Sequence, residues 1–292
     1  MKYGMNLLLW TDDATAESFL PVLERLKKMG FDGVEVPVFD LKPEKFAALG
    51  KRLDDIGLQR TAVTVRTVDD NPISPDAAVR QKGVAANKAV LDCCQAGGMK
   101  LLVGPYYAAL GHFTGRGPTA QEWTHGVESM KQVAAHAETC GVTLALEPLN
   151  RFEIYLLNSA EDGARFVREV AHPRCRLMYD TFHANIEEKS VSAAISACAK
   201  EMVHVHISEN DRSTPGRGQV NWTETFDALH RVGYDGWLTI EAFGQALPAL
   251  AAATKIWRPM FQNEEQLAAD GLAFMQREWA RRAPAQLARK AG

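Results

Sequence analysis

Short apolar runs rich in β-branched residues alternate along the chain with longer amphipathic stretches. The short runs predict eight β-strands, at residues 3–6, 33–36, 59–65, 100–103, 143–146, 176–178, 203–206 and 238–240. The longer stretches predict helices at residues 16–29, 43–56, 75–96, 119–140, 159–170, 191–199, 222–232 and 264–282. Several of these stretches stop at a glycine just before the next strand, which is a common helix C-terminal signal.

This alternation indicates the fold class. Strands that alternate with helices pair in parallel, because each helix returns the chain to the same end of the sheet. Eight such units predict an α/β fold of the closed (β/α)8 TIM barrel type, whereas an open doubly wound sheet usually has about five or six strands. No linker or composition shift divides the chain, so we expect one barrel domain over residues 1–283, followed by a short tail at 284–292.

Composition limits the possible partners and the compartment. The chain carries 33 basic and 36 acidic residues, a formal net charge of −3, which gives no electrostatic reason to expect nucleic acid or an anionic membrane as partner. Its apolar runs are much shorter than the ~20 residues of a membrane helix. Because the N-terminus also lacks a signal-like apolar region, we expect a cytoplasmic protein. Five cysteines without C-x-x-C spacing indicate free thiols.

Residues with metal-ligand chemistry end four consecutive predicted strands: Glu147, Asp180, His206 and Glu241. Their spacing is about one βα unit each, so the four side chains should meet at the carboxyl end of the barrel. Three carboxylates and one imidazole suit Mn²⁺, Co²⁺ or Mg²⁺ better than a closed zinc site. Each acidic residue alone could instead cap the following helix. His204 lies on the same strand face as His206, so one could bind metal while the other packs beneath it.

Several segments around these positions carry a family resemblance: 147–153 (EPLNRFE), 179–183 (YDTFH), 204–206 (HVH), 215–218 (PGRG) and 240–241 (IE). They resemble the sugar isomerases and epimerases with a xylose isomerase-like barrel. The first segment is most similar to the ketose 3-epimerases, which act on sugars such as D-tagatose, D-psicose (allulose) or L-ribulose. The order of elements resembles this family over nearly the whole chain.

The resemblance implies a divalent metal, usually manganese, held by Glu147, Asp180, His206 and Glu241. It also implies that the O1 and O2 end of a free ketose is held by Glu153, His183 and Arg212. Epimerisation at C3 removes a proton next to the C2 carbonyl and returns one to the opposite face, through an enediolate that a metal would stabilise. Because strands five and eight approach the metal from different sides, we expect Glu147 and Glu241 to form the acid/base pair.

Five further residues are candidates for lining the sugar pocket: Asn6, Trp10, Glu35, His112 and Phe113. Core packing or a local salt bridge is the alternative for Trp10 and Glu35, and a plain lid loop is the alternative for His112 and Phe113. The chain departs from the family pattern at Asn6-Leu7, where an aromatic residue is typical, and in the loop at 106–113. These departures leave the preferred ketose open rather than the metal chemistry.

Other activities stay open at this point. Hydroxypyruvate isomerase, inosose dehydratase and aldose–ketose isomerases use a similar constellation, and a non-catalytic sugar-binding barrel would also keep the ligands. A nuclease of the same superfamily is disfavoured, because it would need more histidines than the eight present to bind a cluster of zinc ions. It would also need a basic face for DNA, whereas the net charge is negative. The apolar pairs at 256–257, 260–261 and 274–275 suggest a surface for a homodimer or homotetramer, and packing of a helix on its own barrel is the alternative.

Overall fold

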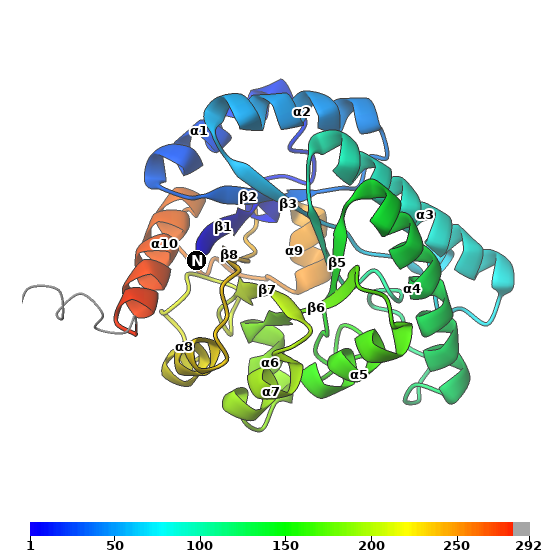
Figure 1. Cartoon of the computed structure of the whole chain (residues 1–292). Coiled ribbons are helices and arrows are strands. Elements are labelled where there is room, and N and C mark those ends of the chain that lie inside the picture. Colours follow the sequence, from blue (N-terminus) through cyan, green and yellow to red (C-terminus); the bar gives the residue numbers. More distant parts are fainter. Residues whose placement is uncertain (283–292) are drawn as a thin grey trace, which may run out of the picture.

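The computed structural model describes residues 1–282, and the tail expected at 284–292 lies outside them. Eight parallel strands close into a barrel in sequence order, which confirms the expected fold class (Figure 1). They are β1 (Lys2–Asn6), β2 (Gly33–Pro37), β3 (Gln59–Val63), β4 (Leu101–Gly104), β5 (Thr143–Leu146), β6 (Cys175–Asp180), β7 (Met202–Ile207) and β8 (Trp237–Ile240). Strand β8 pairs with β1, with Met5 opposite Ile240, so the sheet has no free edge.

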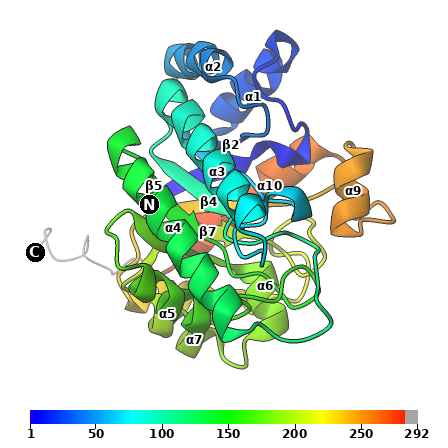
Figure 2. The ribbon, with the colours of Figure 1, turned by 90° about the vertical axis from the view of Figure 1, so that its right-hand side faces the viewer.

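Eight helices surround the barrel: α1 (Leu20–Met29), α2 (Pro43–Ile56), α3 (Ala77–Gly97), α4 (Ala120–Cys140), α5 (Ala160–Val170), α7 (Val191–Cys198), α8 (Trp222–Arg231) and α10 (Glu264–Ala280). Two short helices lie at the carboxyl end of the barrel: α6 (Thr181–Glu187) follows β6 directly, and α9 (Pro248–Thr254) follows β8 after the segment 241–247. Figure 2 shows α9 at the end of the barrel opposite the N-terminus. Three 3-10 turns complete the described elements, η1 (Leu7–Leu9), η2 (Glu17–Phe19) and η3 (Val68–Asp70).

Local sequence explains where the helices begin and end. Helix α4 starts with a capping box in which Thr119 accepts a bond from the Glu122 N–H while Glu122 accepts one from the Thr119 N–H. The same helix ends at Gly141, whose φ of +66° is a left-handed conformation that favours glycine. The helix expected at 16–29 instead opens with η2, and the α-helix begins only at Leu20, with Pro21 in its first turn.

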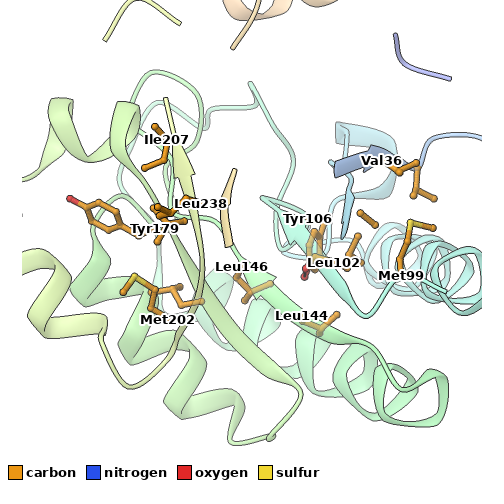
Figure 3. Close-up of a cluster of buried hydrophobic side chains, with 14 of the residues drawn as sticks. Val36, Met99, Leu102, Tyr106, Leu144, Leu146, Tyr179, Met202, Ile207 and Leu238 are labelled. Carbon is orange, nitrogen blue, oxygen red and sulfur yellow. Dashed lines mark hydrogen bonds between the residues drawn. The ribbon is translucent and has the colours of Figure 1, made fainter. Parts of the chain in front are cut away.

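Apolar side chains fill two regions separated by the strands. Those pointing outward pack under the helices, as Figure 3 shows for Leu144 and Leu146 of β5. Alternate residues point inward and form a smaller cluster that includes Val103, Ala145 and Met178. All five cysteines are free and buried. Within residues 1–282, no helix combines the length and apolar character needed to cross a bilayer.

Burial removes three of the six residues expected to form an association surface near the C-terminus. Ile256, Phe274 and Met275 are buried, because Ile256 joins the barrel cluster and Phe274 packs edge-on against Trp222. Trp257 alone of these apolar residues is strongly exposed, at 70%. Packing of α10 on its own barrel, the alternative considered above, therefore accounts for the pair at 274–275.

Candidate active site

The four residues expected to bind metal meet at the carboxyl end of the barrel. Glu147 and Glu241 directly follow β5 and β8, while Asp180 ends β6 and His206 lies in β7. One ligand atom from each lies within 4.8 Å of the others. The Nδ1 atom of His206 is 3.7 Å from Glu147 Oε1 and 3.4 Å from both Asp180 Oδ2 and Glu241 Oε1. All four side chains are buried.

The hydrogen bonding of this cluster fits a divalent cation. Glu147 Oε1, Asp180 Oδ2 and His206 Nδ1 are buried and have no hydrogen-bond partner among the described residues. Buried polar atoms are nearly always paired, and neighbouring carboxylates repel one another. A cation bound by three carboxylates and one imidazole would pair these atoms and offset that repulsion. The residues therefore suit the hard divalent metals that the sequence indicated.

The short helix α6 explains how one residue can cap a helix and face this cluster. Asp180 Oδ1 accepts the backbone N–H groups of Phe182 and His183, at 2.6 and 3.0 Å. Its other oxygen, Oδ2, faces His206. The capping role and the ligand role are therefore compatible, because each uses a different oxygen. Helix α6 also carries His183 to the edge of the cluster.

The three residues expected to hold the substrate lie beside the four ligands. Arg212 Nη1 donates to Glu241 Oε2 at 2.7 Å, and its Nη2 lies 3.0 Å from His183 Nε2 and 3.8 Å from Glu153 Oε1. Asn150 links the other two, because its N–H donates to His183 Nδ1 and its side-chain amide donates to Glu153. The two neighbours compete for the ring, because the Asn150 N–H donates to Nδ1 while Arg212 Nη2, which can only donate, faces Nε2.

Burial and packing fix the orientation of Arg212. The guanidinium lies 3.7 Å from the ring centroid of Phe182 and 4.9 Å from that of Phe243, so it makes cation–π contacts with both rings. Its backbone has a φ of +62°, which is uncommon for residues other than glycine and typical of functional sites. Glu209 stabilises the surrounding loop, since its carboxylate accepts the backbone N–H groups of Asn210, Gly216 and Val220 and the indole N–H of Trp222.

The environment separates the acidities of neighbouring groups. Burial, together with the negative charges of Glu147 and Asp180, raises the pKa of the Glu241 carboxyl well above its usual range, although His206 and Arg212 act in the opposite direction. Burial and the Arg212 charge lower the pKa of His183, so this ring is neutral near pH 7. Although burial acts in the opposite direction, the neighbouring His183, His206 and Arg212 lower the pKa of Asp180, so the carboxyl groups of Asp180 and Glu241 differ in acidity.

The pocket candidates divide into two groups. Asn6 and Glu35 lie close beneath the ligands, because Asn6 Nδ2 donates to Glu241 Oε1 at 3.3 Å and Glu35 Oε1 lies 2.7 Å from His206 Nε2. Glu35 is fully buried, so it lies inside the barrel rather than in an open pocket. Trp10 is half-buried and packs against the main core. His112 and Phe113 lie in the loop after β4, where Phe113 is exposed near Tyr155.

Two contributors to the site were given no role by the sequence analysis. Asn150 belongs to the EPLNRFE segment, and its position in that segment was the signal that could have indicated it. Glu209 follows β7 in a polar loop, where an acidic residue is ordinarily exposed. Its complete burial depends on N–H groups that lie up to 13 residues further along the chain. No local pattern announces such an arrangement.

Known proteins share this architecture over nearly the whole chain. A family model described as xylose isomerase-like TIM barrel matches residues 23–278. The D-psicose 3-epimerase of Ruminiclostridium cellulolyticum is 31% identical, covering 91% of this chain and 92% of that protein. The L-ribulose 3-epimerase of Mesorhizobium japonicum is 33% identical, covering 94% and 93% respectively. The crystal structure of a D-allulose 3-epimerase from Methylomonas sp. in complex with D-allulose matches with a TM-score of 0.89 and 28% identity, covering 95% of this chain and 97% of that chain.

These matches include all the strands whose ends form the cluster. The family model begins within α1 and ends within α10, so it spans β2 to β8. From its closed parallel barrel and these matches together, the chain belongs to the xylose isomerase-like TIM barrel family.

Proposed function

We propose that this protein catalyses the metal-dependent epimerisation of a free ketose at C3. The observation that carries the proposal is the convergence of Glu147, Asp180, His206 and Glu241 within 4.8 Å, where three of the ligand atoms have no hydrogen-bond partner within residues 1–282. Relatives named D-psicose and L-ribulose 3-epimerase, each aligned over more than 90% of this chain, support a ketose as the substrate. Mn²⁺ is the expected metal, with Co²⁺ or Mg²⁺ as alternatives that the same donor set accepts.

The two glutamates have positions suited to opposite faces of one carbon. In the barrel, β5 and β8 are three strands apart, so Glu147 and Glu241 approach the site from different sides. One removes the proton from C3, and the other returns a proton to the opposite face, which inverts the configuration. A divalent metal bound here supplies Lewis-acid stabilisation of the negative charge that develops on the substrate oxygens.

The neighbouring residues would bind and orient the ketose. His183 Nε2 lies 3.8 Å from Glu147 Oε1 at the edge of the cluster, so this ring can form a hydrogen bond with a substrate oxygen. Arg212 supplies a fixed positive charge beside Glu241 and His183. Glu153, held by Asn150, can accept a substrate hydroxyl. Together these three groups would hold the O1 and O2 end of the sugar and leave C3 between the glutamates.

Deuterium exchange tests this function directly. Metal-free and Mn²⁺-loaded protein would be incubated with D-fructose, D-tagatose and L-ribulose in D₂O, and deuterium at each carbon would be followed by NMR. We expect deuterium at C3 and a C3-epimeric product only with metal. Deuterium at C1 together with an aldose product would establish an aldose–ketose isomerase instead. Absence of exchange with every sugar would favour a dehydratase or a sugar-binding barrel.

A further inference from the structure

An unusual polar cluster lies inside the barrel below the proposed metal site. TIM barrel interiors are mostly filled by branched apolar side chains. Here Glu35 of β2, Thr61 of β3 and His204 and His206 of β7 meet in the interior, and both histidines and Glu35 are completely buried. A buried carboxylate is stable only when it is well paired. We therefore looked for a function of these polar side chains that apolar residues at the same positions could not perform.

Hydrogen bonds occupy both oxygens of Glu35. Its Oε1 lies 2.7 Å from His206 Nε2 and accepts from Asn6 Nδ2 at 3.0 Å. Its Oε2 accepts from Thr61 Oγ1 at 2.9 Å and lies 3.1 Å from His204 Nε2. Because Asn6 and Thr61 donate to this carboxyl group, one to each oxygen, Glu35 serves as the acceptor, and His206 donates to it from Nε2.

This bond determines which ring nitrogen of His206 faces the site. With its proton on Nε2, the ring presents Nδ1 to Glu147, Asp180 and Glu241. That atom is buried and has no hydrogen-bond partner among the described residues. A histidine that binds a metal commonly donates its other ring N–H to a carboxylate, which fixes both the tautomer and the ring orientation.

The same carboxylate also reaches a second proposed ligand. Asn6 Nδ2 donates to Glu35 Oε1 and, at 3.3 Å, to Glu241 Oε1. The amide orientation of Asn6 is fixed because its Oδ1 accepts the N–H of Leu8. Glu35 thus contacts His206 directly and Glu241 through Asn6.

We propose that Glu35 is a positioning residue for the metal site, which sets the tautomer of His206 and, through Asn6, the position of Glu241. The proposal rests on the proposed function only in taking the four converging residues as metal ligands. It predicts that Glu35 controls metal affinity from a position where it does not contact the metal or the sugar. A purely structural role would leave the metal affinity of a folded variant unchanged.

Mn²⁺ affinity of a Glu35 variant tests the proposal. Glu35→Leu removes the acceptor for His206 while keeping an apolar group of similar size in the barrel. We expect its Mn²⁺ affinity, measured from free Mn²⁺ by electron paramagnetic resonance, to fall by about 10- to 100-fold. Glu201→Leu is the matched control, because Glu201 is also largely buried but pairs with Arg168 outside the site. Thermal unfolding of each metal-free variant verifies that it is folded.

An affinity of folded Glu35→Leu within about twofold of wild type would overturn the proposal. If this variant does not fold, NMR of the Mg²⁺-loaded wild-type protein tests the proposal instead. With ¹⁵N-labelled histidine, the proton of His206 should reside on Nε2 and exchange slowly with solvent, because it is buried and bonded to Glu35. A proton on Nδ1, or rapid exchange at Nε2, would contradict the proposed role. These measurements need no sugar, so a failure of the proposal for Glu35 can be distinguished from a failure of the epimerase proposal.

Discussion

At the scale of single residues, the positions of polar residues at strand ends identified the four proposed metal ligands. They did not identify Glu35 as the residue that contacts His206. The four residues Glu147, Asp180, His206 and Glu241 were predictable because each lies close to the carboxyl end of a strand, and parallel strands end at one edge. The contact between His206 and Glu35 joins residues 171 positions apart. A pairing at that distance has no signature in one sequence, so Glu35 could be named only as a pocket candidate.

If Glu147 and Glu241 each exchange a proton on one face of C3, a variant that lacks one of them should act differently on the two C3 epimers. Glu241→Gln keeps the shape of the side chain and an acceptor for Arg212 but cannot exchange a proton at C3. We expect epimerisation at saturating Mn²⁺ to fall by about 10²- to 10⁴-fold, the usual contribution of one acid/base group. Because Glu147 remains, one of the two epimers should still take up deuterium at C3 without forming the other.

The measurement is NMR in D₂O, starting separately from each C3 epimer. Glu278→Gln, which changes a largely buried carboxyl group in α10, is the control and should retain the wild-type rate. Equal uptake by both epimers in Glu241→Gln would exclude Glu241 as one of the two proton carriers. Loss of metal from the variant, checked by its Mn²⁺ content, would be a separate cause of inactivity.

At the scale of elements, periodicity predicted all eight strands and the helices that surround them. The predicted helices left out α6 and α9, which have seven residues each, and α6 also follows β6 with no loop between them. A helix that short contains too few turns to show an apolar repeat. The N-cap of α6, Asp180, was assigned as a metal ligand with capping as the alternative, whereas the geometry allows both.

The capping box of α4 predicts a measurable pH dependence. Although burial acts in the opposite direction, hydrogen bonds from Thr119 and Tyr155 lower the pKa of Glu122 in the folded protein. A lowered pKa means that this stabilisation is present above the ordinary glutamate pKa of about 4.3 and is lost as the pH falls through the folded value. Below that range, the start of α4 should be less stable.

Glu122→Gln tests whether the charge of Glu122, rather than its hydrogen bond to Thr119, stabilises the start of α4. Glutamine can still accept the Thr119 N–H, so we expect the free energy of unfolding at pH 7 to change by less than about 1 kcal/mol. The loss of stability between pH 6 and pH 3 should be smaller in the variant than in wild type. Denaturant unfolding at a series of pH values measures both. Identical pH profiles would show that Glu122 does not contribute through its ionised form.

At the scale of the whole molecule, the exposed apolar residues are concentrated at one end. Within residues 1–282, every strongly exposed large apolar side chain lies in a segment that follows the carboxyl end of a strand: Phe39, Leu41, Val68, Phe113, Phe152, Ile186 and Trp257. None lies on the helices that form the outer ring. Apolar surface concentrated in this way is typical of an interaction face.

We expect this end of the barrel, rather than the buried pair at 274–275, to mediate the predicted self-association. Phe152 and Trp257 are its most exposed members, at 72% and 70%. The double variant Phe152→Ser and Trp257→Gln should shift the protein towards monomer in light scattering across a concentration series, because both large apolar groups leave the contact. Lys51→Ser, an exposed change on α2, should leave the mass unchanged. A wild-type protein that is monomeric at every concentration would contradict this assignment. The exposed apolar side chains at this end would then only surround the entrance to the site.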